Sequence, residues 1–326
     1  MISTKKIFAI ENESDFERLA LEIFRYQAKN VLVYQNFLSH LKRNPDEVTN
    51  YQNIPFLPVE FYKSHEIIVK DKKSEIIFES SSTTGSTPSK HYVASKNLYE
   101  ESFLNGFIAQ YGEPKELCIL ALLPSYLERS GSSLVYMAEK LIHLSSHPES
   151  GFYLNDHVKL IAVLKKLKIS GTPTLLLGVS YALLDLAEKY QEDLSGIIIM
   201  ETGGMKGRRK ELVKEDLHLY LKKSFNVESI HSEYGMTELL SQAYSKGSGK
   251  FFCPPWMKVL IRDSYDPFQI LNSRNTGGIN IVDLANIYSC SFIASADLGR
   301  INQDESFEVL GRIDNSDIRG CNLMIE

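Results

Sequence analysis

The sequence of 326 residues lacks the features that mark several large classes of protein. It has no long basic run and a net charge of −5, which argues against a nucleic-acid partner and against a polybasic contact with membranes. No apolar stretch is long enough to span a bilayer, since Leu117–Leu123 is far too short. The N-terminal residues Met1–Lys6 have no apolar signal-peptide core behind them. These absences predict a protein that neither spans a membrane nor binds nucleic acid.

Cysteine is also sparse and widely spaced. The four cysteines are Cys118, Cys253, Cys290 and Cys321, and no two of them form a CxxC pair. This spacing suggests neither a zinc site nor a disulfide framework, and the histidines show no metal-ligand spacing. A reducing cytoplasm is therefore the expected location.

The composition that is present is typical of a globular protein. Hydrophobic residues make up 43% and charged residues 24% of the chain, which is long enough for a substantial core. No internal repeat or low-complexity linker divides it. We therefore expect one domain with a helical N-terminal region (1–60), an α/β core (61–256), a β-rich section (257–314) and a C-terminal tail (315–326).

The pattern of apolar residues predicts the elements of this domain. Ser14–Leu41 has helical spacing and is interpreted as one long helix or two short ones, and Asn53–Tyr62 as a crossing loop. Short apolar runs then alternate with helical patterns, which indicates an α/β fold with a largely parallel sheet. One of these runs, Val227–His231, is predicted to be a strand. From Met257 onward the pattern favours antiparallel strands.

The segment Glu79–Lys90 carries the strongest signal for a binding site. Five consecutive hydroxyl residues precede a glycine, and a lysine ends the segment. Backbone N–H groups, hydroxyls and the lysine together suit an anion such as phosphate, although such a run alone is also typical of a surface loop. The spacing is not that of a P-loop, because no second glycine precedes the lysine. The candidate phosphate contacts are Ser82, Thr83, Thr84, Gly85 and Lys90.

Three further motifs follow in order: Tyr234–Glu238, Ser295–Arg300 and Gly311–Asp314. Together with the hydroxyl-rich loop, their order and distances resemble the adenylate-forming superfamily of acyl- and aryl-CoA ligases, luciferases and peptide-synthetase adenylation domains. The resemblance spans residues 76–321. It implies the fold of the large N-terminal domain of these enzymes, with mostly parallel sheets in several layers and a final β-rich section.

The resemblance also implies a reaction in which a carboxylic acid and ATP give acyl-AMP and pyrophosphate. The hydroxyl-rich loop would hold the leaving phosphates, Thr237 the α-phosphate, and Glu238 a Mg²⁺ ion. Tyr234 would stack on adenine, whose pocket Gly203 and Gly204 would line. Asp297 would accept hydrogen bonds from the ribose hydroxyls, although Ser-Ala-Asp stands where the superfamily usually has Thr-Gly-Asp. Arg312 would reach the ribose or a phosphate.

Each of these motifs also has a purely structural interpretation. Tyr234–Glu238 suits a helix N-terminus capped by Thr237 or Glu238, and Thr202–Gly204 suits a simple turn. Asp297 and Arg312 suit a surface ion pair. The basic residues that follow Gly204 suit a solvated helix start as well as a pyrophosphate contact; they are Lys206, Arg208 and Arg209.

The end of the sequence points to a subgroup. Relatives carry a small C-terminal domain with a lysine that assists adenylation, whereas twelve residues follow Asp314 here. The chain in this respect resembles acyl-protein synthetases, the LuxE-type subunit of the fatty-acid reductase complex in luminous bacteria. The resemblance implies that Cys321 accepts the acyl group and that a fatty acid passes on to an acyl reductase or an acyl-carrier partner. Arg319, two residues before Cys321, is expected to lower the pKa of its thiol.

Two other functions are consistent with the same motifs. One is a CoA ligase whose C-terminal domain is supplied by another polypeptide. The other is a non-catalytic scaffold that binds adenylate within a multienzyme complex, which the missing lysine favours.

Overall fold

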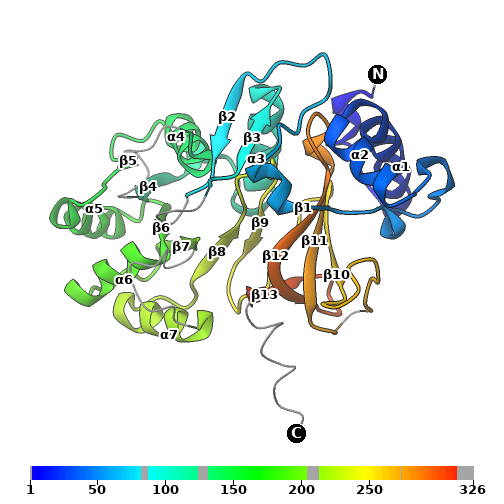
Figure 1. The fold of residues 1–326 in the computed structure, drawn as a ribbon. Coiled ribbons are helices and arrows are strands. Elements are labelled where there is room, and N and C mark those ends of the chain that lie inside the picture. The colour runs from blue at the N-terminus through cyan, green and yellow to red at the C-terminus, as the bar shows by residue number, and fades with distance from the viewer. Residues whose placement is uncertain (1, 82–86, 124–130, 204–212, 273, 314–326) are drawn as a thin grey trace, which may run out of the picture. The chain divides into compact units, whose positions relative to one another are not determined.

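The computed structural model describes residues 2–81, 87–123, 131–203, 213–272 and 274–313, drawn in colour in Figure 1. The chain divides into two compact units. The first unit comprises Met1–Glu75, His91–Ser95 and Phe252–Glu326, and the second comprises Ile76–Lys90 and Lys96–Phe251. The expected single domain with its four segments stays a prediction. Among the described residues, no helix has both the length and the apolar character needed to cross a membrane.

The second unit is built on a six-stranded sheet in the order β5-β4-β6-β7-β8-β9 (Figure 1). All neighbouring strands are parallel except β8 and β9, which are antiparallel. This arrangement confirms the predicted α/β fold. The strands are β4 (Cys118–Leu122), β5 (Gly151–Phe152), β6 (Thr174–Val179), β7 (Ile198–Thr202), β8 (His231–Tyr234) and β9 (Ala243–Ser245).

Helices connect the parallel strands of this sheet. The chain passes from β4 outward to β5, and then back past β4 to β6, β7 and β8. Because such crossovers are right-handed, this change of direction places α4 on one face of the sheet and α5, α6 and α7 on the other. The helix α3 packs with α4. The bounds of these helices are α3 (Lys96–Tyr111), α4 (Ser133–Ser145), α5 (His157–Ser170), α6 (Ser180–Lys189) and α7 (Lys214–Phe225).

The predicted strand Val227–His231 is wrong in position. Helix α7 ends with Asn226 in the left-handed conformation, and pairing with β7 begins only at His231. Val227 and Ile230 are buried, but they lie in the connection that leads to β8. The sequence of the strand is His-Ser-Glu-Tyr, and this polar composition lacks the apolar residues by which a buried strand is predicted.

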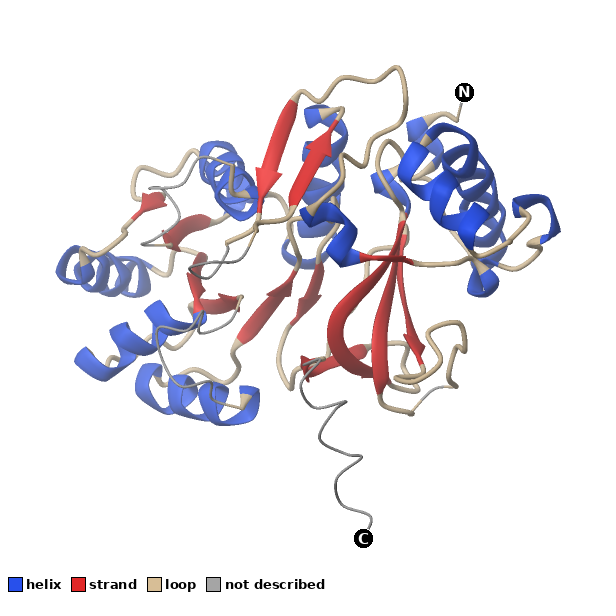
Figure 2. Cartoon of the chain, viewed as in Figure 1, coloured by secondary structure: helices blue, strands red, loops and turns tan. Residues whose placement is uncertain are grey.

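The first unit combines two helices with an antiparallel sheet, whose strands are red in Figure 2. The segment Ser14–Leu41 forms two helices, α1 (Glu13–Asn30) and α2 (Leu32–His40), and Asn12 caps the first by accepting from the N–H of Asp15. The predicted crossing loop contains a short strand, which pairs in parallel with β12. The strands are β1 (Leu57–Pro58), β10 (Met257–Arg262), β11 (Gly277–Asp283), β12 (Phe292–Ile301) and β13 (Phe307–Arg312). A separate two-stranded sheet pairs β2 (Ile76–Glu79) with β3 (Lys90–Val93).

A buried glutamine ties α1 to the loop before β12. The amide nitrogen of Gln27 donates to the carbonyl oxygens of Asn286 and Ile287, at 3.0 Å each, and its amide oxygen accepts from the N–H of Ser291. The Gln27 side chain is fully buried. Backbone groups that would otherwise be unpaired inside the core are thus satisfied.

We expect Gln27→Leu to destabilise the protein by about 2 kcal/mol, because leucine fills the space but leaves buried backbone groups of residues 287 and 291 without partners. Urea unfolding followed by circular dichroism measures the change. The control is Gln35→Leu on the exposed surface of α2, which should shift the midpoint little. Equal midpoints for the Gln27 variant and the parent would contradict this role.

Candidate functional site

The two ends of the hydroxyl-rich loop are held together in the second unit. Ser80 and Ser89 pair through their backbones, and the Ser80 hydroxyl also accepts from the N–H of Ser89 at 2.8 Å. Lys90 forms an ion pair with Glu79 at 3.2 Å, and both side chains are exposed. The residues between, Ser82, Thr83, Thr84 and Gly85, lie outside the described residues. The phosphate-binding role of the loop stays a prediction.

Three predicted residues lie together where β8 ends. The carbonyl of Met236 accepts from the N–H of Leu239, so the chain makes a turn after Tyr234 and continues to β9. No helix begins within residues 235–240, which rules out the interpretation of Thr237 and Glu238 as helix caps. Glu238 is 5% exposed, while Thr237 and Tyr234 are half-buried.

Gly203 lies beside this turn, at the end of β7. It has a φ of 67°, a conformation that favours glycine, and its carbonyl accepts from the Ser180 hydroxyl at 2.8 Å. Since Thr202 pairs with Glu233, the ends of β7 and β8 lie at the same edge of the sheet. This is the edge where α/β proteins bind ligands. Gly204 lies outside the described residues, as do the basic residues of 205–212.

A buried carboxylate, Glu201, supports this edge from the face that α6 and α7 cover. The Ser180 hydroxyl donates to it at 3.0 Å, and the Lys214 ammonium lies 2.9 Å from its Oε1. Burial opposes ionisation of Glu201, but Lys214 and hydrogen bonds from His218 and Ser232 outweigh it, so its pKa falls to about 2. Glu201 is therefore ionised at neutral pH.

The Lys214 ammonium links this carboxylate to aromatic residues. It lies 4.4 Å from the centre of the Phe251 ring, and Phe251 packs edge-on against Tyr234 at 5.8 Å between ring centres. Lys214 is thus a positive charge close to a tyrosine that was predicted to contact adenine. The sequence alone did not single out this lysine.

A second buried carboxylate, Glu233, faces the opposite side of the sheet. Its Oε2 accepts a short hydrogen bond from the Thr202 hydroxyl. Burial raises the pKa of Glu233 to about 7, and the charge of Glu201 on the neighbouring strand adds to this rise, while Thr202 opposes it. Glu233 therefore titrates near neutral pH.

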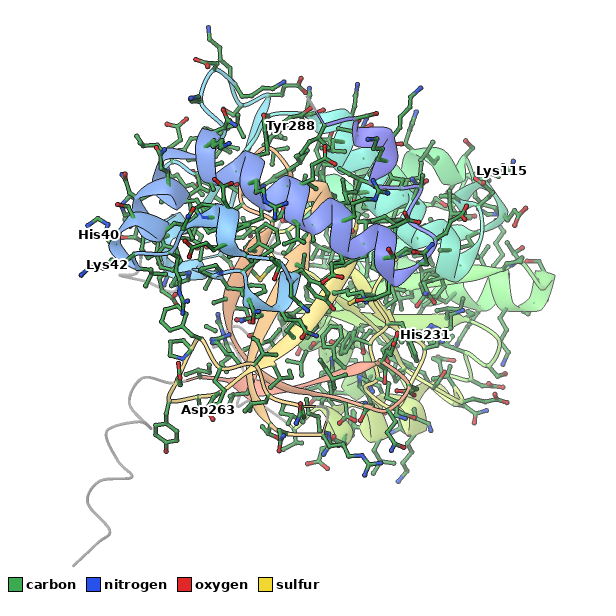
Figure 3. All side chains as sticks on the ribbon, turned by 90° about the vertical axis from the view of Figure 1, so that its right-hand side faces the viewer. His40, Lys42, Lys115, His231, Asp263 and Tyr288 are labelled. Atoms are coloured by element: carbon green, nitrogen blue, oxygen red, sulfur yellow. The ribbon has the colours of Figure 1, made fainter. Side chains whose placement is uncertain are left out.

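Tyrosines surround Glu233 on this face. Burial, with the nearby Glu233 carboxyl, raises the pKa values of Tyr99, Tyr111 and Tyr244 above the usual value for a phenol. His231, labelled in Figure 3, lies at the start of β8, where its Nδ1 is 3.1 Å from the Tyr111 hydroxyl. Burial and Lys246 lower the pKa of His231 to about 4, so it is neutral at pH 7.

The remaining predicted residues belong to the first unit. Asp297 on β12 pairs in register with Arg312 on β13, and Arg312 Nε lies 3.6 Å from Asp297 Oδ1. The Asp297 side chain is 20% exposed and that of Arg312 is 79% exposed. An ion pair this exposed stabilises little, so the predicted ribose contacts of these two residues stay open to test.

The described cysteines are poor candidates for a nucleophile. Burial raises the pKa values of Cys253 and Cys290 to about 12, and that of Cys118 is also raised by burial. Since the thiolate is the reactive form, these three thiols are almost entirely unreactive at pH 7. Cys321 lies outside the described residues.

The described residues contain no group of three His, Cys, Asp or Glu side chains that holds a metal by itself. Mg²⁺ is commonly held by one or two carboxylates together with substrate phosphates and water. Glu238, a carboxylate at the ligand-binding edge of the sheet, fits such a shared site.

Four polar residues near this edge were not predicted from the sequence: Glu201, Lys214, Glu233 and Gln242. A signal existed for two of them, because a glutamate follows the apolar run 197–200 directly and another precedes Tyr234. Charged residues at the end of a buried strand are costly unless they are paired or functional. For Lys214 and Gln242 no local signal existed.

Known proteins match this chain in structure alone. No model of a known protein family matches the sequence, and no curated protein matches it. An open conformation of 2-hydroxyisobutyryl-CoA ligase, solved with 2-HIB-AMP and CoA, is similar with a TM-score of 0.69 at 11% identity, over 94% of this chain and 71% of that one. The same ligase in its thioesterification state gives 0.70 at 13% identity, over 94% and 70%.

A second protein, solved with ATP, is similar over a shorter region. ATP-bound MatB from Rhodopseudomonas palustris gives a TM-score of 0.55 at 15% identity, over 72% of this chain and 47% of that one. The chain thus has the α/β fold of the large N-terminal domain of adenylate-forming ligases, as the motifs predicted. It spans about half the length of MatB.

Proposed function

We propose that this chain activates a carboxylic acid with ATP. A carboxylate oxygen attacks the α-phosphorus, the bond to pyrophosphate breaks, and an acyl adenylate forms. The observation that carries the proposal is the clustering of Gly203, Tyr234, Thr237 and Glu238 at the carboxyl edge of the sheet, in a fold shared with ligases solved with ATP or an acyl adenylate.

In this proposal the chain's own residues position and neutralise the phosphates. Thr237 donates a hydrogen bond to a non-bridging oxygen of the α-phosphate. Glu238 would hold a Mg²⁺ ion, which would supply positive charge against the charge that develops on the leaving pyrophosphate. Lys90 and the hydroxyls of Ser82, Thr83 and Thr84 hold that leaving group, and Tyr234 orients the adenine. Because both reactants are anions, alignment and charge neutralisation supply most of the rate.

The second step transfers the acyl group to a thiol. The Cys321 thiolate attacks the acyl carbonyl, a thioester forms, and AMP leaves with the electron pair of the broken bond. The weak nucleophilicity of the three described thiols supports Cys321 as the acceptor. An acyl reductase or an acyl-carrier protein then takes the acyl group. The cytoplasm remains the expected location.

A CoA ligase is the second candidate, because a ligase similar in fold was solved with CoA. Product analysis with CoA and without any partner protein separates the two: acyl-CoA release supports the CoA ligase, and a protein-bound acyl group supports transfer to Cys321. A non-catalytic scaffold predicts neither product.

Exchange of labelled pyrophosphate into ATP, dependent on an added acid, tests the adenylation step. We expect at least one acid in a panel of fatty, aryl, hydroxy and amino acids to drive it at millimolar Mg²⁺. No exchange with any acid would remove the proposal and leave the scaffold. If calorimetry also shows no binding of ATP, the scaffold is removed as well.

Mass spectrometry after incubation with ATP, Mg²⁺ and the active acid tests the second step. We expect a hydroxylamine-labile adduct that Cys321→Ser abolishes, while Cys253→Ser retains it. Because thiol esters are cleaved by hydroxylamine and ordinary esters and amides resist it, the chemistry of the adduct is diagnostic. An adduct on another residue contradicts the assignment of Cys321.

A further inference from the structure

Three buried polar side chains gather on one face at the end of β8 and β9. The antiparallel register pairs Glu233 with Tyr244, so both side chains project to the same face, and Gln242 lies two residues before Tyr244, just before β9 begins. All three are more than nine-tenths buried. We call Glu233, Gln242 and Tyr244 the acceptor cluster.

Gly235 is what allows two members of the cluster to meet. A Cβ at this position would collide with Oε1 of Glu233 and would lie 3.3 Å from Cγ of Gln242. The glutamate carboxyl and the glutamine side chain therefore come together over a glycine backbone, in the segment that also carries Tyr234 and Glu238. A side chain at 235 would displace them.

Two oxygens of the cluster have no partner within the described part of the chain. The amide oxygen of Gln242 and the hydroxyl of Tyr244 have no hydrogen-bond partner among the described residues. Of the Glu233 oxygens, Oε2 is the one that accepts from Thr202. Buried polar atoms in folded proteins are nearly always paired, so two unpaired atoms beside a buried carboxyl indicate that a donor group is missing.

A primary ammonium group matches this deficit. It has three N–H donors and no acceptor, and its positive charge complements the Glu233 carboxylate. A plain alkyl chain would leave the oxygens of Gln242 and Tyr244 unpaired and add a desolvation cost. A hydroxyl can donate to Gln242 and accept from Tyr244, but it gives the Glu233 carboxylate no opposite charge.

We propose that the acid activated by this chain carries an amino group, which the acceptor cluster binds as an ammonium ion. This inference rests on the proposed function for the carboxylate end of the substrate, and it names the substrate class. The amine contacts Glu233, Gln242 and Tyr244, while the carboxylate lies toward Thr237 and Glu238. An amino acid is therefore the substrate, in place of the fatty acid that the sequence resemblance implies.

The proposed amino group on the substrate is tested with acids that match in length but differ in one substituent. Pyrophosphate exchange is measured with propanoate, lactate and alanine, and with hexanoate, 6-hydroxyhexanoate and 6-aminohexanoate, followed by the other common amino acids. We expect kcat/KM for the best amino acid to exceed that of its plain analogue by at least about 100-fold, because a site built for donors rejects a ligand without them. Preference for the plain acids at every length overturns the proposal.

Conservative variants assign the effect to the cluster. Glu233→Gln should lower kcat/KM for the amino acid by about 100-fold, mainly through KM. Tyr244→Phe, which removes one hydroxyl, should lower it by about tenfold. Tyr220→Phe on α7, whose ring is 38% exposed, is the matched control. If all variants still prefer the amino acid over its plain analogue, internal water satisfies the polar groups of the cluster. This result refutes the proposal.

Direct binding separates this inference from the proposed function. Calorimetry with the same amino acids, without ATP, should show binding to the parent that weakens at least about tenfold in Glu233→Gln. Binding without exchange for any acid would remove the adenylation proposal and keep the amine site. Exchange driven by plain acids without amine binding would remove the amine site and keep adenylation. Melting temperatures of all variants establish that they are folded.

Discussion

Glu238→Gln is expected to lower acid-dependent pyrophosphate exchange by about 100- to 1,000-fold. Glutamine has nearly the same shape as glutamate but no negative charge, so the position keeps its fit at the end of β8 and loses its hold on a divalent cation. The Glu238 side chain is 5% exposed and lies within the turn that the Met236 carbonyl and the Leu239 N–H close, so it is held in place by the fold. The loss should appear in kcat and in a higher Mg²⁺ concentration for half-maximal exchange.

The matched control is Glu228→Gln. Glu228 is an exposed glutamate shortly before β8, and we expect its variant to exchange at the parent rate. Melting temperatures of both variants distinguish loss of catalysis from loss of fold. If Glu238→Gln keeps its fold and exchanges within about threefold of the parent at every Mg²⁺ concentration, the metal-binding role of Glu238 is wrong.

Glu233→Gln is expected to make the folded protein more stable at pH 8, by about 3 kcal/mol, and to change its stability little at pH 4.5. The pKa of Glu233 is about 7 in the folded chain, against a usual value of 4.5. Between these two pH values the folded chain keeps a proton that the unfolded chain releases. The stability of the parent therefore falls as pH rises from 4.5 to 7 and then stays constant. Glutamine does not titrate, so the variant lacks this loss.

The other titratable groups near Glu233 either titrate outside this pH range or contribute equally to the stability of parent and variant. The raised pKa values of Tyr99, Tyr111 and Tyr244 keep them neutral throughout this range. Glu201 titrates near pH 2. His231 has a pKa lowered to about 4, so its contribution to stability rises from pH 4 to 6.5 in parent and variant alike.

Urea unfolding of parent and variant at pH 5, 6, 7 and 8 measures the effect, and the difference between the two curves isolates Glu233. We expect this difference to widen with pH. Parallel profiles would mean that the carboxyl of Glu233 is hydrated or paired in solution. A variant that gains stability while it loses amino acid binding would place Glu233 among the residues that are retained for function at the expense of stability.

A large part of the fold could be predicted from local sequence patterns. The helix and strand patterns of residues 94–200 and 257–310 correspond to observed elements, because burial on one face produces a periodicity that short segments display by themselves. The fold class followed from the alternation of these patterns and from four ordered motifs. Strand β8 was misplaced because Ser232 and Glu233 are polar, although both are buried.

Some residues of the candidate site were likewise recognisable from the sequence, and others were not. The turn at Gly203 and the motif Tyr234–Glu238 were recognisable because each is contiguous and contains glycine, whose backbone freedom marks a tight turn or a close approach. The partners of Glu201 and Glu233 were not recognisable. They come from α3, α6, α7 and β9, and no local pattern shows which helix covers which face of the sheet.

The sequence by itself therefore determined the α/β class and indicated the residues that are proposed to face a nucleotide, because both depend on local periodicity and on short motifs. The tertiary structure alone decided which polar side chains are enclosed. Burial and the lack of a hydrogen-bond partner are properties of strand order and of contacts between distant segments, such as Thr202 with Glu233. For this reason the acceptor cluster, and with it the proposed amino acid substrate, became apparent only from the fold.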